Sequence, residues 1–86
     1  MKIFKYELKV IEFQLIQLPF NSKVLCVKNQ RDNLVLYAEV PDKVNVSYRS
    51  LAINIFGTGC IIPEHGLEYI DTVLTHDGTY AWHIYI

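Results

Sequence analysis

The chain has 86 residues and a formal net charge of −1, and 51% of its residues are hydrophobic. A chain of this length and composition folds as one domain over residues 1–86, and it is too hydrophobic for a disordered segment. No run of about 18 apolar residues could cross a membrane, and charges recur too often near the N-terminus for a signal peptide. We therefore expect a cytoplasmic protein without membrane contact.

In the first half of the chain, alternating apolar and polar residues predict four strands. They cover residues 4–10, 13–18, 24–28 and 34–40. Residues 11–12 are expected to join the first two strands as a hairpin, although they lack the Gly, Asn or Asp typical of a tight turn. The polar residues 29–33 predict a five-residue turn between the other two strands, which form the clearest hairpin of this half.

The second half continues the same pattern. Strands are predicted over residues 44–49, 51–56, 67–74 and 80–86. The alternation changes phase at Ser50, which predicts either a bulge there or one long curved strand. Asp77-Gly78 is the strongest hairpin signal in the chain. The last strand has no polar tail, so we expect it inside a sheet or paired with another copy of the protein.

These strands define the expected fold class. No window of ten or more residues has a helical period, and seven or eight short strands recur every 8–12 residues or so. The sequence therefore predicts an all-β fold, a single small antiparallel barrel or sandwich of about seven strands.

A glycine-rich turn follows the predicted strand 51–56, and it is the first candidate site. Phe56, Gly57, Thr58 and Gly59 can form a ligand cradle, because glycines after a strand expose backbone N–H groups to an anion. A dinucleotide fingerprint would need a third Gly and a helix, and a P-loop would need Gly-Lys-Ser/Thr. Neither follows here, so the alternative is a simple tight turn.

Cysteine and histidine give weaker signals. Cys60 lies near Glu64 and His65, but a thiolate nucleophile needs a base within hydrogen-bond reach, and closeness in sequence does not supply this. The three histidines, His65, His76 and His83, are 11 and 7 residues apart, whereas zinc ligands are typically paired about two to five residues apart. We therefore expect no catalytic residue, no metal and no cofactor.

Charge and aromatic residues are unevenly distributed. All eight Lys and Arg residues lie within the first 49 positions with five acidic residues, a balance of +3, whereas residues 51–86 hold four acidic residues and no basic one, a balance of −4. Stacking platforms for nucleic acid need a basic groove, so direct nucleic-acid binding is not expected. Aromatic residues also anchor protein interfaces, and the expected interface residues are Tyr69, Trp82, His83 and Tyr85.

Four stretches of the sequence carry a family resemblance. They are residues 1–8 (MKIFKYEL), 55–59 (IFGTG), 67–73 (LEYIDTV) and 82–84 (WHI). Together they resemble a family of short proteins of unassigned function that tailed bacteriophages and prophages encode. In that pattern a His commonly follows the second Gly, where this chain has Cys60. The resemblance implies a phage accessory protein that acts in the cytoplasm of the bacterial host.

The function that we expect is binding rather than catalysis. The leading hypothesis is a phage accessory protein that inhibits a bacterial defence system, either by binding a host protein or by sequestering a small nucleotide-like signal. The first alternative is a structural or virion-accessory homo-oligomer without a ligand. The second is a small enzyme that uses Cys60 and His65.

Overall fold

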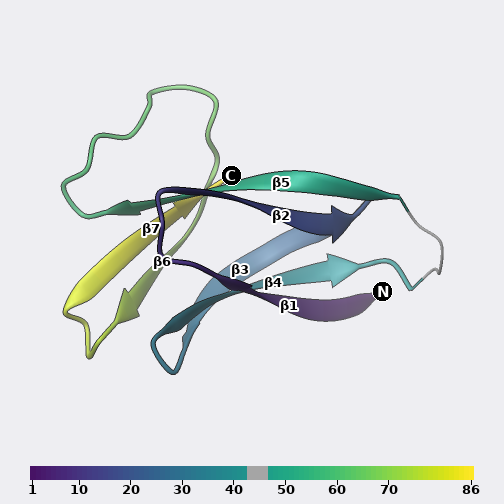
Figure 1. Ribbon diagram of the computed structural model, residues 1–86, viewed down its shortest axis with the longest axis horizontal. Helices are drawn as coiled ribbons and strands as arrows, with labels where there is room; N and C mark the ends of the chain where they lie inside the picture. The colour runs from purple at the N-terminus through teal and green to yellow at the C-terminus, as the bar shows by residue number, and fades with distance from the viewer. Residues whose placement is uncertain (43–46) are drawn as a thin grey trace.

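The computed structural model describes residues 1–42 and 47–86, in which seven strands form two antiparallel sheets that face each other (Figure 1). The three-stranded sheet has the order β1 (Lys2–Leu8), β4 (Asn33–Val40), β3 (Lys23–Gln30). The four-stranded sheet has the order β2 (Phe13–Pro19), β5 (Tyr48–Gly57), β7 (Tyr80–Tyr85), β6 (Tyr69–Thr75). The predicted all-β class is confirmed, and of the two predicted architectures the structure has the sandwich.

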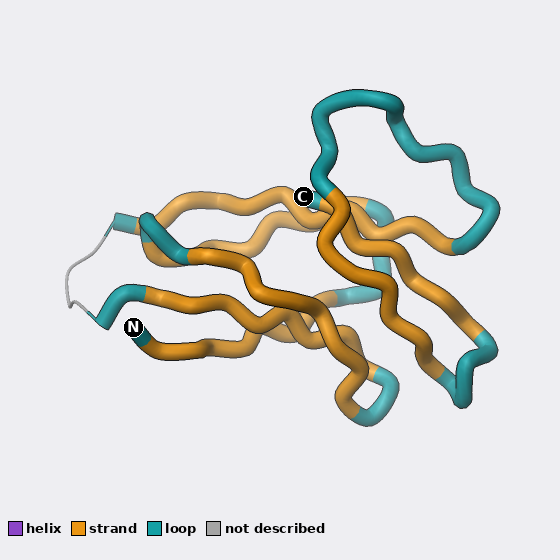
Figure 2. The backbone as a smooth tube through the Cα atoms, turned by 180° about the vertical axis from the view of Figure 1, so that it is seen from behind, coloured by secondary structure: helices purple, strands orange, loops and turns teal. Residues whose placement is uncertain are grey.

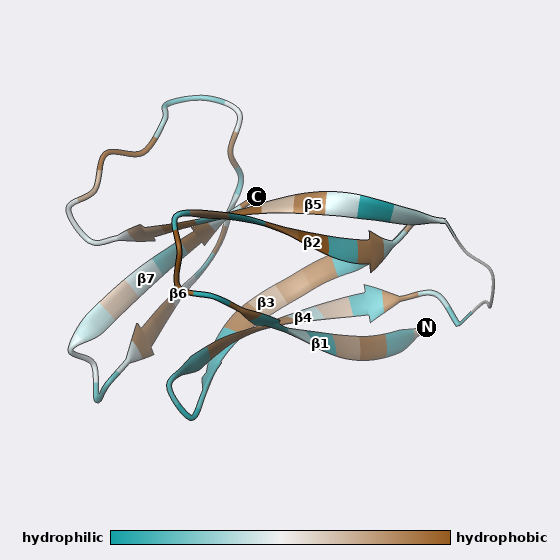
Figure 3. Ribbon diagram, viewed as in Figure 1, coloured by the Kyte–Doolittle hydropathy of each residue, from teal (hydrophilic) through white to brown (hydrophobic). Residues whose placement is uncertain are grey.

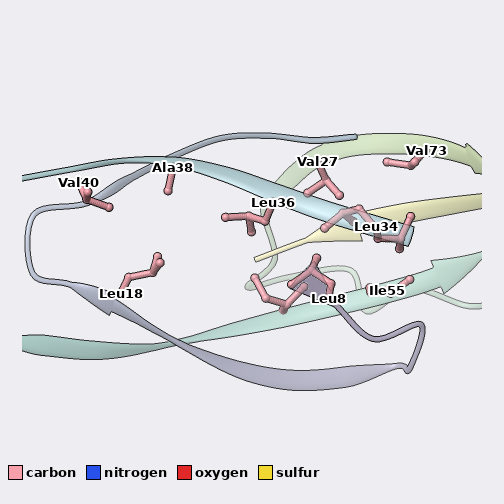
Figure 4. Close-up of a cluster of buried hydrophobic side chains, with 11 residues drawn as sticks. Leu8, Leu18, Val27, Leu34, Leu36, Ala38, Val40, Ile55 and Val73 are labelled. Carbon is pink, nitrogen blue, oxygen red and sulfur yellow. The ribbon is translucent and has the colours of Figure 1, made fainter. Parts of the chain in front are cut away.

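The core lies between the sheets and contains alternate residues of the strands (Figure 4). Leu34 and Leu36 of β4 and Ile53 of β5 are completely buried. Burial of each such side chain contributes about 1.5–3 kcal/mol. Within the described residues there is no helix that is long and apolar enough to cross a membrane.

The first two strands do not form the hairpin that the sequence predicted. β1 pairs with β4 and β2 pairs with β5, so residues 9–12 carry the chain from one sheet to the other. The side chain of Gln14 fixes this crossing, since it accepts a hydrogen bond from the Lys9 amide (3.1 Å) and donates one to the Lys9 carbonyl (2.6 Å). The prediction was wrong because period-two alternation shows that a strand has a buried face but does not identify its partner strand.

The two other predicted hairpins are confirmed. β3 pairs with β4 and β6 pairs with β7, both antiparallel. The turn after β3 is shorter than predicted, because only Arg31 and Asp32 lie outside the strands, both with positive φ (54° and 64°). Such a two-residue turn matches the right-handed twist of the flanking strands. Gly78, with φ of 84°, belongs to the β6–β7 turn.

β5 is one long strand, and its ladder with β2 runs from Tyr48 to Asn54 without a change of register. One continuous strand therefore crosses Ser50, as the second alternative predicted, and the bulge expected there is absent from this ladder. The predicted strand 44–49 and the turn that begins at Pro41 lie partly outside the described residues. The last strand, β7, lies between β5 and β6, which confirms the expectation that it sits inside a sheet.

Polar side chains join the two sheets along the β3 and β6 edges. One carboxylate oxygen of Asp71 in β6 accepts a hydrogen bond from the Val27 amide (3.2 Å) and lies 3.3 Å from the Lys28 ammonium group. The Asn29 side-chain amide donates to the carbonyl of Leu74 (2.8 Å). These contacts keep the β6–β7 hairpin against the three-stranded sheet, while the long loop between β5 and β6 extends away from both sheets (Figure 2).

Asp32 makes the stability of this junction depend on pH. Hydrogen bonds from the His76 amide (2.9 Å) and then from the Asn29 side chain (3.3 Å) to its carboxylate lower the pKa of Asp32. A lowered folded-state pKa stabilises the fold above the unfolded pKa of about 3.9, and this contribution is lost as the pH falls through the folded-state pKa. We expect Asp32→Asn to weaken the decline in urea midpoint between neutral pH and this acid range. Equal declines for Asp32→Asn and the wild type would contradict this role.

Candidate functional site

Strand alternation divides the expected interface residues between the two faces of β7. Trp82 points toward the other sheet and packs against the core cluster, opposite Val73 of β6. His83 and Tyr85 have the other phase, so they lie on the outer face of the four-stranded sheet. Tyr69, more than half exposed, lies beside Tyr85 on that outer face. The expected set therefore forms two separate groups.

On the outer face, hydroxyl groups hold both ring nitrogens of His83. Its Nε2 shares a hydrogen bond of 2.8 Å with Oγ1 of Thr58, and its Nδ1 shares one of 3.0 Å with Oγ1 of Thr72. The Tyr69 hydroxyl lies 2.7 Å from the same Thr72 oxygen. This chain of four polar side chains fixes the start of the β5–β6 loop to the sheet.

Aromatic rings pack beside this chain on the same face. The ring of Tyr85 meets Phe56 at 5.8 Å and Tyr69 at 5.5 Å between centroids, both edge to face. Such contacts contribute about 0.5–1.5 kcal/mol each beyond simple burial. Phe56 is buried, so it supports the turn and offers little surface to a ligand.

The inward face of the β6–β7 hairpin carries a second aromatic group. The indole Nε1 of Trp82 donates a hydrogen bond to Oγ1 of Thr75 (3.1 Å), a buried residue. Tyr80 stacks on Trp82 with 5.9 Å between ring centroids, and His76 meets Tyr80 edge to face. Trp82 is thus held in position by a hydrogen bond and by a stacked ring.

A hollow of about 290 Å³ lies beside this aromatic group. It forms because β5 ends at Gly57, opposite Trp82, while β7 continues past this point with β6 as its neighbour on the other side. The hollow is lined by Gly57, Thr58, Gly78, Thr79, Tyr80, Ala81 and Trp82.

Gly57 contributes to the hollow because it has no side chain. A Cβ atom at this position would lie 3.6 Å from Cζ3 of Trp82 and 3.9 Å from Sγ of Cys60. Gly59 has a different role, since its φ of 92° forms a turn in which the Cys60 amide bonds to the Gly57 carbonyl (3.2 Å). Of the four expected cradle residues, the structure places Gly57 and Thr58 at the hollow and Phe56 and Gly59 outside its lining.

The geometry around His83 also indicates what chemistry this region can support. A hydroxyl at 2.8 Å from an imidazole is the first pair of a nucleophile–base arrangement, but the next group along is the Thr72 hydroxyl, where such sites place a carboxylate to orient the base. The Asp71 carboxylate is bonded instead to the amides of Val27 and Thr72. The network is suited to holding the loop in position.

Cys60 is a free, exposed cysteine, as is expected of a chain without paired thiols, and Cys26 is also free. Its sulfur borders Gly57. Among residues 1–42 and 47–86, no group of three or more His, Cys, Asp and Glu side chains is arranged to hold a metal ion.

Sequence reasoning missed the hydroxyl groups that position the aromatic residues. Thr75 lies in the inward phase of β6, and Thr72 lies in the outward phase. The signal was present for Thr75, since a threonine at a core position requires a hydrogen-bond partner. No local signal identifies Thr72 and Thr58 as neighbours of the same histidine, because the three residues belong to different segments.

The fold and these two aromatic groups define a small antiparallel β-sandwich with a hollow at the end of one central strand. The chain belongs to a family described as a domain of unknown function (DUF7352), whose model matches residues 1–86. No curated protein and no solved structure matches the chain.

Proposed function

We propose that this chain is a binding protein that holds a small ligand with a flat ring, such as the base of a nucleotide signal, beside Trp82. The observation that carries the proposal is the hollow at the end of β5, where Gly57 leaves space next to a tryptophan that Tyr80 and Thr75 hold in place. Aromatic side chains bind bases by stacking, with about 1–3 kcal/mol per base.

The charge distribution indicates which part of a nucleotide the site recognises. Residues 51–86 contain no Lys or Arg, and these are the side chains that bind phosphate most strongly. Of the two threonine hydroxyls among the lining residues, that of Thr58 is bonded to His83, and that of Thr79 is an uncharged donor and acceptor. The ring is therefore the recognised part, and phosphate groups extend into solvent.

The biological role that fits this binding is sequestration. Sequence stretches such as residues 55–59 and 67–73 resemble short phage and prophage proteins. A phage accessory protein in the host cytoplasm that withdraws a nucleotide signal would inhibit the bacterial defence that depends on it. Such a role needs affinity and abundance and no catalytic group.

The single tryptophan of the chain makes the binding directly measurable. Titration with adenosine, guanosine, their monophosphates and cyclic dinucleotides is expected to change Trp82 fluorescence in a saturable way, with nucleosides binding at least as tightly as their phosphates. Tyr80→Ala should weaken binding by about two- to tenfold, because one aromatic contact contributes about 0.5–1.5 kcal/mol. Tyr48→Ala is the matched control, since Tyr48 is also exposed and lies outside the hollow lining. Unchanged fluorescence with every compound, or equal affinity of Tyr80→Ala and the wild type, would refute the proposal.

A further inference from the structure

The outer face of the four-stranded sheet differs from the outer face of the three-stranded sheet in its charge. In the three-stranded sheet the outward positions include both lysine and glutamate on neighbouring strands. These residues are Lys5, Glu7, Lys23, Lys28 and Glu39. In the four-stranded sheet the outward positions of β2, β5, β6 and β7 contain no charged residue. They are Phe13, Leu15, Gln17, Pro19, Tyr48, Ser50, Ala52, Asn54, Phe56, Tyr69, Thr72, Leu74, Ala81, His83 and Tyr85.

Large apolar side chains stand at both ends of this uncharged face. Phe13 and Leu15 of β2 lie at one edge of the sheet, and Leu74 and Tyr69 of β6 lie at the other, each between 54% and 57% exposed. Figure 3 shows hydrophobic residues recurring along β2, β5 and β6. The four side chains together offer roughly 400 Å² of exposed surface, divided between the two edges of the face.

We propose that this face binds the same face of a second copy of the chain, to form a two-fold symmetric dimer. The pattern is apolar at both edges and polar in the middle, where Asn54, Thr72 and His83 lie. A two-fold axis in the plane of contact can run along the line that joins the two edges or perpendicular to that line. In either case an apolar edge of one copy meets an apolar edge of the other, and the polar middles of the two copies meet each other. The face is thus complementary to itself.

Charge selects the second copy over a partner of different chemistry. A face without charged residues gains nothing from an acidic or basic partner, and two copies of it meet without repulsion. Packing of two sheets face to face is also an ordinary arrangement of β-sheets, about 10 Å apart. A stable interface buries about 800 Å² per partner, and the four large apolar side chains of this face offer about half of that, so we expect a dimer that dissociates in the micromolar range.

This dimer is independent of the proposed ligand site. Trp82 lies on the opposite face of β7 from His83 and Tyr85. A substitution at Leu15, on β2 at the far edge of the sheet, is therefore expected to change the mass of the particle and leave the Trp82 fluorescence titration unchanged.

Sedimentation equilibrium over a range of concentrations tests the proposal. The expected mass is twice that of one chain at high concentration, decreasing to that of one chain on dilution. Leu15→Lys and Leu74→Lys should each raise the dissociation constant more than about tenfold, because each introduces an unpaired charge into an apolar contact. Ile3→Lys is the control: Ile3 is 63% exposed on the outer face of the three-stranded sheet, and its substitution should leave the dimer intact.

Two results would overturn the proposal. A wild-type chain that stays monomeric at every concentration excludes the second copy and leaves this face for a different protein. A dimer that Leu15→Lys and Leu74→Lys do not weaken, in chains whose circular dichroism shows that they remain folded, places the contact on another surface.

Discussion

Replacement of Ile84 by alanine should lower the free energy of unfolding by about 2–5 kcal/mol. Ile84 is completely buried in the core cluster, one residue before the end of β7, and it faces the three-stranded sheet. Alanine removes three carbon atoms from a site between two sheets that cannot approach each other to close the cavity, because their edges are joined. Urea denaturation, followed by circular dichroism, measures the change.

Ile61→Ala provides the matched control for this prediction. Ile61 is 94% exposed in the loop between β5 and β6, so the same substitution should change stability by less than about 0.5 kcal/mol. Similar effects of the two substitutions would mean that β7 does not lie at the centre of the core. Because β7 also carries Trp82 and His83, that result would mean that both aromatic groups of the candidate site lie elsewhere than described.

The strands themselves could be predicted from sequence because local alternation determines which residues of a strand are buried. The Asp77-Gly78 signal likewise identified the β6–β7 hairpin, since its turn depends on residues next to one another. Pairing between distant strands could not be predicted in this way. The crossing at residues 9–12 depends on the hydrogen bonds between the Gln14 side chain and the Lys9 backbone. It also depends on β4 and β5, which come later in the chain and provide the edges to which β1 and β2 pair.

The candidate site was predictable only in part, for the same reason. Gly57 and Trp82 were both recognised as unusual in the sequence, and the structure places them opposite each other in neighbouring strands. Their proximity follows from the β5–β7 register, which no local pattern encodes. Trp82 and His83 lie on opposite faces of β7 because successive residues of a strand alternate between its two faces. The prediction that both residues belong to one interface did not take this alternation into account.

The second large effect is expected at Thr75, which links the core to the proposed ligand site. Thr75 is buried, and its hydroxyl accepts the hydrogen bond from the Trp82 indole (3.1 Å) and lies 3.1 Å from Nδ1 of His76. Thr75→Val keeps the shape of the side chain but leaves the indole N–H without its partner. Because this hydrogen bond is part-buried, the unpaired donor should cost about 1 kcal/mol, the lower end of the range for buried donors, and this loss should appear in the urea midpoint.

Thr75→Ser shows how much of the loss of stability comes from the hydroxyl group and how much from the methyl group of Thr75. Serine retains the acceptor for Trp82 and loses one methyl group, a change of about 0.8 kcal/mol, so it should be more stable than the valine variant. The valine variant should also bind ring ligands more weakly than the serine variant, because the hydrogen bond to Thr75 orients the indole beside Gly57. If valine were as stable as threonine and bound ligands equally well, the hydroxyl would have no part in positioning Trp82, and the wall of the hollow would depend on the Tyr80 stack alone.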